Sequence, residues 1–142
     1  MTRTWLPLAL TVAANVLYHV AQKSMPRQTP PLVPLAAVYV VALVVTLVAL
    51  PFTLGGQRLG TALRQLDWAA VGVGIAIVGV EVGFLLAYRA GWDLGTAAIT
   101  STVCLALLLA PAGVLLFGEA VTPGRGLGIL LCLLGLVLVH RG

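Results

Sequence analysis

Long apolar stretches separated by short polar segments are the dominant pattern of this chain. An α-helix needs about 20 predominantly apolar residues to cross the hydrocarbon core of a bilayer. The stretches are close to that length, so the pattern predicts five transmembrane helices over the single domain 1–142. We expect these helices at about 4–21, 33–54, 68–88, 94–117 and 124–140.

The composition restricts the class of protein. Hydrophobic residues make up 61% of the chain and charged residues 8%, whereas a soluble domain carries about 25% charged residues. The chain is therefore expected to be an all-α, multi-pass integral membrane protein. Its eight basic residues are scattered singly and are interpreted as anchors for lipid headgroups, not as a nucleic-acid surface.

No pattern typical of an enzyme is present. The sequence has no nucleophile elbow, no phosphate-binding loop and no cluster of metal ligands, so we expect no enzymatic activity, no cofactor and no bound metal. Cys104 and Cys132 each lie within an apolar stretch and are interpreted as small packing residues.

The basic residues are divided equally between the two sides of the predicted bundle. One side holds Arg3, Arg58, Arg64 and Arg125, and the other holds Lys23, Arg27, Arg89 and Arg141. Excess positive charge normally marks the cytoplasmic side, so this distribution favours neither orientation. Two interpretations stay open: a partner decides the topology, or the chain inserts both ways and pairs antiparallel.

The first predicted helix carries polar side chains on one face. Thr11, Asn15, Tyr18 and Gln22 are spaced four, three and four residues apart, and His19 follows Asn15 by four. Polar side chains within a bilayer face other helices or a hydrated cavity. Interhelical hydrogen bonding and a pocket wall are both consistent with this pattern.

The third predicted helix contains a lone carboxylic acid, Glu81. It follows Trp68 by 13 residues, or about 20 Å along a helix, which places it within a hydrocarbon core about 30 Å thick. A charge at that depth costs about 2.5–3.5 kcal/mol, and a carboxylate avoids much of this cost by taking up a proton. Glu81 is therefore the candidate proton or cation site, with Tyr88 on the same face; a structural hydrogen bond is the alternative.

The opposite face of this helix is lined by small residues. Gly72, Gly79 and Gly83 recur at helical spacing, and such stripes let two helix backbones approach closely. In the fourth predicted helix, Thr100 is a candidate pocket residue, although its hydroxyl can bond to its own helix. Pro111 is expected to kink that helix, because proline removes a backbone donor.

The stretch "LLAYRAGWDLGTAAITSTVCLALLLAPAGVLLFGEAVTPGRGLGILLCLLGLVLVH" resembles the EamA domain of the drug/metabolite transporter superfamily. The matching features are a small-residue helix with a central proline, a Leu-Leu-x-Gly-Glu turn ending at Glu119, and a glycine-rich last helix. Larger members of that superfamily contain two five-helix repeats in inverted orientation. One repeat therefore implies an antiparallel homodimer.

The stretch "ANVLYHVAQKSM" is similar to the first helix of the small multidrug resistance family, in which a glutamate precedes a lysine by eight residues. Here Asn15 precedes Lys23 by eight. An asparagine cannot exchange a proton. The resemblance therefore implies a pocket position at Asn15 but not a proton site.

Together, these patterns and resemblances predict a small secondary transporter of the cell inner membrane. We expect it to move a small metabolite or a cationic, drug-like solute by alternating access, with proton coupling through Glu81. Asn15, Tyr18, His19, Thr100 and Tyr88 are further candidate pocket residues. The alternatives are a subunit of a flippase for lipid-linked sugars and a non-transporting membrane assembly subunit.

Overall fold

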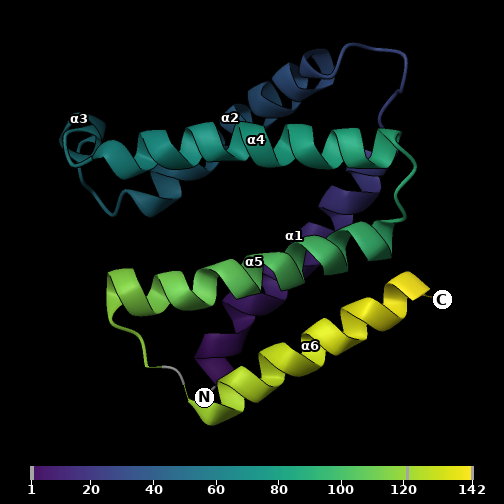
Figure 1. Ribbon diagram of the computed structural model, residues 1–142. Coiled ribbons are helices and arrows are strands. Elements are labelled where there is room, and N and C mark those ends of the chain that lie inside the picture. Colours follow the sequence, from purple (N-terminus) through teal and green to yellow (C-terminus); the bar gives the residue numbers. More distant parts are fainter. Residues whose placement is uncertain (1, 121, 142) are drawn as a thin grey trace. The chain divides into compact units, whose positions relative to one another are not determined.

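The computed structural model describes residues 2–120 and 122–141, apart from the side chains of residues 2–4 and 125 (Figure 1). Over these ranges every regular element is a helix, which confirms the predicted all-α class. The helices are α1 (Thr2–Lys23), α2 (Leu32–Thr53), α3 (Leu59–Leu63), α4 (Trp68–Arg89), α5 (Leu94–Phe117) and α6 (Pro123–Arg141).

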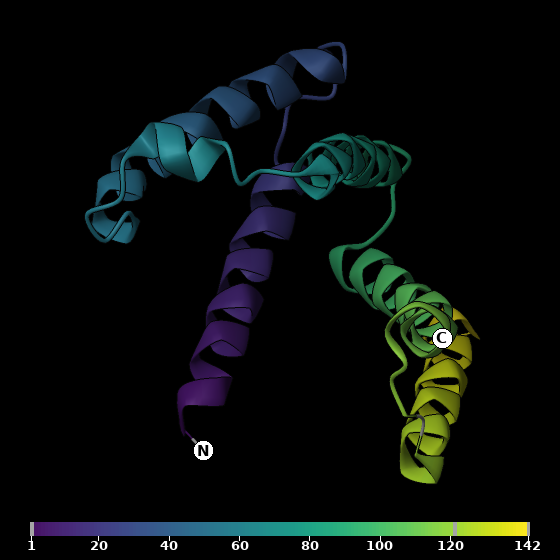
Figure 2. The same cartoon turned by 90° about the vertical axis from the view of Figure 1, so that its left-hand side faces the viewer.

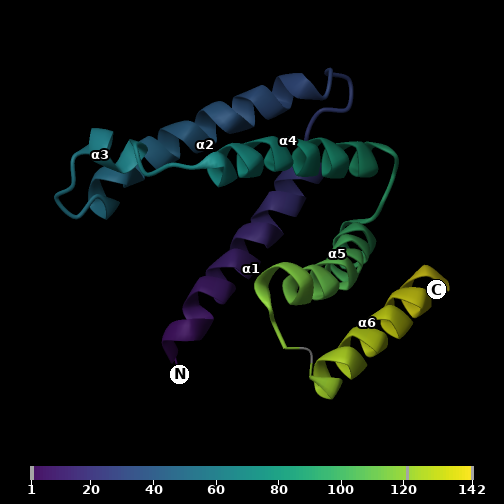
Figure 3. The same ribbon diagram turned by 60° about the vertical axis from the view of Figure 1, so that its left-hand side comes forward.

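The chain divides into two compact units. Unit 1 comprises Met1–Ala21 and Ala90–Gly142, and unit 2 comprises Gln22–Arg89. In unit 1, α5 and α6 pack side by side, as both Figure 1 and Figure 2 show. In unit 2, α2 packs against α4, and α3 lies in the connection between them (Figure 3).

Three of the helices, α2, α4 and α5, are long and apolar enough to cross a membrane. Many large apolar side chains of these helices are exposed; Phe52 is 88% exposed and Leu115 is 82% exposed. Soluble monomers rarely show such continuous apolar surface, whereas a multi-pass membrane protein presents it to lipid. The apolar part of α6 is shorter, at Gly126–Arg141.

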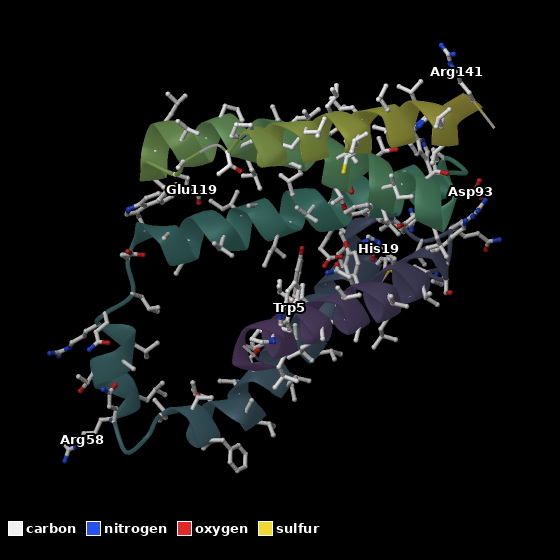
Figure 4. The ribbon with its side chains drawn as sticks, turned by 90° about the horizontal axis from the view of Figure 1, so that it is seen from below. Trp5, His19, Arg58, Asp93, Glu119 and Arg141 are labelled. Atoms are coloured by element: carbon white, nitrogen blue, oxygen red, sulfur yellow. The ribbon has the colours of Figure 1, made fainter. Side chains whose placement is uncertain are left out.

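The ends of the five long helices lie within two residues of those predicted from the sequence. The short helix α3 was not predicted. It forms a single turn between Arg58 and Arg64, and Arg58 points away from the ribbon (Figure 4). A segment of five residues is too short for its hydrophobic pattern to distinguish a helical turn from a polar loop.

The end of α5 is set by Gly118, which adopts a left-handed backbone with φ of 64°. Its N–H donates to the carbonyl of Val114 at 3.1 Å, and the N–H of Glu119 donates to the carbonyl of Gly113 at 3.1 Å. These bonds satisfy carbonyls that the helix end would otherwise leave unpaired. The carboxylate of Glu119 folds back toward α5, where a Cβ on Gly113 would lie 2.8 Å from Oε2.

Candidate functional site

Unit 2 contains four side chains that are almost completely buried. Leu35 from α2 and Leu85 and Tyr88 from α4 are each at most 2% exposed. Gln22, near the end of α1, is buried to the same degree and is the polar member of this group. A buried amide loses its hydrogen bonds to water, so it must find partners within the protein.

Gln22 finds these partners on Glu81. Its Nε2 donates to the Glu81 carboxylate oxygen Oε2 at 3.0 Å and to the Glu81 backbone carbonyl at 2.9 Å. Glu81 is half-buried and lies within α4, one of the three helices apolar enough to span a membrane. Because Gln22 is a neutral amide, it orients the carboxylate without supplying a positive charge to compensate it.

Tyr39 of α2 is the second polar side chain at this site. It lies within electrostatic range of the Glu81 carboxylate. Its hydroxyl oxygen is buried and has no hydrogen-bond partner among the residues that the structure describes. A buried hydroxyl left unpaired costs about 1–3 kcal/mol, so the position of Tyr39 calls for an explanation beyond packing.

The nearest basic residue along α4 has a different role. Arg89 donates through Nη2 to the backbone carbonyl of Pro26 at 2.9 Å, which fastens the segment between α1 and α2 to the end of α4. Tyr88 is buried beside it and stacks on Phe84, with ring centroids 6.0 Å apart. The predicted site residues Glu81 and Tyr88 therefore belong to one packed region of unit 2.

In unit 1, three of the polar residues that were predicted to share a face of α1 lie around one hollow. Thr11, Asn15 and Tyr18 line a shallow, open hollow of about 380 Å³ together with Leu10 and Ala14. The Asn15 amide donates to the carbonyl of Thr11 at 3.0 Å, within its own helix. The Asn15 side chain is therefore exposed at the hollow while one of its donors is already used.

His19 projects from α1, and its ring meets Tyr18 edge to face at a centroid distance of 4.9 Å (Figure 4).

Thr100 of α5 differs from its neighbour Ser101 in its hydrogen bonding. Ser101 bonds to the carbonyl of Ala98 at 3.1 Å, whereas the Thr100 hydroxyl is buried and finds no partner within the described part of the chain. Thr100 thus keeps its hydrogen-bonding capacity.

The predicted helix-packing glycines have little beside them within the described part of the chain, and the predicted kink residue lies within a continuous helix. A Cβ added at Gly79 or Gly83 would meet nothing within 4 Å among the described residues, and one added at Gly72 would touch only the Trp68 ring. The small-residue stripe is thus open within this chain. α5 continues through Pro111 without interruption to Phe117.

Two aspects of the site were missed in the sequence. Tyr39 was not selected, although a tyrosine hydroxyl in the otherwise strongly apolar stretch of α2 was a usable signal. Gln22 was placed on the polar face of α1, but its pairing with Glu81 was not expected.

Among residues 2–120 and 122–141, no three His, Cys, Asp or Glu side chains form a group that could hold a metal ion.

Comparison of the chain with protein-family models, with curated proteins and with solved structures gave no match in any of the three. A function for this chain therefore has to be argued from its residues and their geometry.

Proposed function

We propose that this protein is a small secondary transporter of the cell inner membrane, built from one five-helix repeat of the EamA type that works as an antiparallel homodimer. The observation that carries the proposal is the Glu81 carboxylate, held by the neutral amide of Gln22 within an apolar helix. Ionisable side chains at such positions are expensive, and they commonly mark ion or substrate pathways.

The chemistry of the site suits exchange between a proton and a solute. An ionised Glu81 attracts a proton or a cationic group, and either one removes the unfavourable charge from the bilayer. The Gln22 amide donates a hydrogen bond to the ionised carboxylate. When the carboxyl group is protonated, its carbonyl oxygen can still accept that hydrogen bond. Glu81 can therefore change its protonation state without losing its support.

Tyr39 supports the same proposal. Its buried hydroxyl has capacity for a hydrogen bond that the described residues do not use, and a bound solute beside Glu81 would use it. The aromatic ring of Tyr39 in unit 2 adds a surface that attracts cations. Four further residues remain predicted pocket residues because of the sequence pattern alone: Asn15, Tyr18, His19 and Thr100.

Alternating access explains why two copies are proposed. Transporters of this kind commonly combine inverted repeats around a site near the bilayer midplane, and this chain carries one repeat. Two antiparallel chains would supply two Glu81 carboxylates to one pathway. Protons and a cationic solute would then compete for them, which is the basis of coupled exchange.

The test is solute flux into proteoliposomes with and without a pH gradient. A panel of small metabolites and cationic drugs is compared for wild type and Glu81→Gln at equal reconstituted amounts. Glutamine keeps the shape and the bond to Gln22 but cannot titrate. We expect the variant to insert normally and to lose pH-driven flux, and we expect Glu81→Asp to keep part of it.

The possible outcomes separate the rival functions. Equal flux and equal pH dependence in wild type and Glu81→Gln would make Glu81 a structural hydrogen-bonding group. Movement of a lipid-linked sugar alone would indicate a flippase subunit. If the wild-type protein moves no solute in the panel and no lipid, a non-transporting assembly subunit is the better interpretation.

A further inference from the structure

The Glu81 carboxylate keeps hydrogen-bond acceptor capacity that the described residues do not use. Its Oε2 accepts a hydrogen bond from Nε2 of Gln22 at 3.0 Å, and no other described residue donates to the carboxylate. The two oxygens of a carboxylate offer about four acceptor positions. Gln22 is neutral, and Arg89, the basic residue of α4, bonds to the backbone carbonyl of Pro26. A solute bound at this carboxylate therefore has to bring both a positive charge and hydrogen-bond donors of its own.

The Tyr39 hydroxyl is a second oxygen with unused capacity in unit 2. It belongs to α2, which packs against the helix that carries Glu81, and it lies within electrostatic range of the Glu81 carboxylate. The hydroxyl oxygen is buried and has no hydrogen-bond partner within the described part of the chain. A phenylalanine ring would fill the same space, so packing alone does not account for this oxygen. A phenol oxygen both donates and accepts hydrogen bonds, so it can serve a bound solute in either way.

The chemistry of the bound cation decides whether both oxygens are used. A primary ammonium group carries three N–H donors, so one can bond to Glu81 while another bonds to the phenol oxygen of Tyr39. A quaternary ammonium group has the same charge but no N–H. It would neutralise Glu81 and contact the Tyr39 ring, but it would leave the hydroxyl unpaired. A proton on Glu81 would likewise remove the charge without using the Tyr39 hydroxyl as an acceptor.

We propose that Tyr39 makes this site select ammonium solutes that carry N–H groups over quaternary ammonium solutes, an inference that rests on the transport function proposed above. Glu81 supplies the opposite charge, Gln22 holds the carboxylate in position, and the Tyr39 hydroxyl accepts a second N–H bond. The hydroxyl is covered in this conformation, so a solute reaches it when α2 and α4 shift. Alternating access requires movements of this kind.

The experiment measures binding of two matched probes, butylammonium and butyltrimethylammonium, by calorimetry to the purified full-length protein in a non-ionic detergent. We expect wild type to bind butylammonium more tightly. Tyr39→Phe should weaken butylammonium binding about tenfold and change butyltrimethylammonium binding by less than about twofold. Glu81→Gln should weaken binding of both probes, since both carry the charge. Thr46→Val is the matched control, because it deletes a hydroxyl of α2 that bonds to the Ala42 carbonyl of its own helix at 2.8 Å; it should change neither.

The proposal is overturned if neither probe binds, if wild type binds the quaternary probe as tightly, or if Tyr39→Phe weakens both probes equally or neither. Circular dichroism and gel filtration establish that each variant is folded, and the wild-type comparison of the two probes tests the selectivity should Tyr39→Phe fail to fold. Selective binding without any flux in proteoliposomes would contradict the transport function and leave this recognition intact. Flux through Glu81 that shows no preference for N–H groups and is unchanged in Tyr39→Phe would contradict the selectivity and leave transport intact.

Discussion

The side-chain amide of Gln22 is hydrogen bonded to two acceptors of one residue, the carboxylate and the backbone carbonyl of Glu81. A donor that bridges the side chain and main chain of the same residue restricts the rotamer of that side chain. Gln22 itself is 2% exposed and is held by its packing. The carboxylate in α4 is therefore fixed in position by a neutral group from the end of α1.

Removing this donor should destabilise the protein. We expect Gln22→Leu to lower the free energy of unfolding by about 1–2 kcal/mol, because both acceptors of Glu81 lose a buried partner. The effect should be smaller in a Glu81→Leu background, where the carboxylate is already absent. A double-mutant cycle on thermal unfolding in detergent measures the coupling, and a coupling of zero would contradict a stabilising Gln22–Glu81 bond.

Removing the Tyr39 hydroxyl should have the opposite effect on stability. Tyr39→Phe keeps the ring and deletes a buried group without a partner among the described residues, so we expect equal or higher thermal stability, by up to about 1–2 kcal/mol. If the hydroxyl binds the transported solute, the same variant raises the KM for flux. A clear loss of stability would show instead that the hydroxyl has a structural partner.

The sequence predicted the long helices well, because the length of an apolar stretch is a local property. The turn before α5 and the glycine that ends it, Gly118, are visible in the order of residues alone. The short helix α3 was not predicted, since LGTAL lies among Gly, Gln and Arg and its composition is that of a polar loop.

The pairing of Gln22 with Glu81 was beyond the sequence for a physical reason. The two residues are 59 positions apart, and helical periodicity only identifies which residues share a face of one helix. In a membrane, the face toward lipid and the face toward another helix are both apolar, so hydropathy does not indicate which faces meet. Tyr39, in contrast, was identifiable as a polar atom in an apolar helix.

Gly113, near the end of α5, and Gly118, which ends it, should respond differently to the same substitution. Gly118 has φ of 64°, where an added Cβ costs about 1–2 kcal/mol, so we expect Gly118→Ala to destabilise the protein by about that amount. Gly113→Ala places a Cβ against Oε2 of Glu119, the end of a flexible side chain that can move away. We therefore expect a smaller loss there, measured by thermal unfolding, and an equal or larger loss would contradict this account of the turn.

The small-residue face of α4 predicts an effect on assembly. A Cβ added at Gly79 would meet nothing within 4 Å among the described residues. The Cβ introduced by Gly79→Leu therefore makes no close contact within the described part of this chain. Loss of oligomerisation in the variant would therefore indicate that another helix packs on this face. Gly74→Leu on the opposite face is the matched control, since its Cβ position is also open. Unchanged oligomeric state and stability in Gly79→Leu would contradict a stripe interface.

The equal division of basic residues predicts dual topology. With four on each side of the predicted bundle, we expect C-terminal reporter fusions to show both orientations of the wild-type chain. Two lysines added beside Arg3 should fix one orientation, and two added beside Arg141 should fix the other. Either variant alone should lose transport because its antiparallel partner is absent, while co-expression of the two should restore it. Glutamines added at the same positions control for the insertion itself. A wild-type chain with every C-terminus on one side, or full transport by one fixed variant alone, would rule out the antiparallel homodimer.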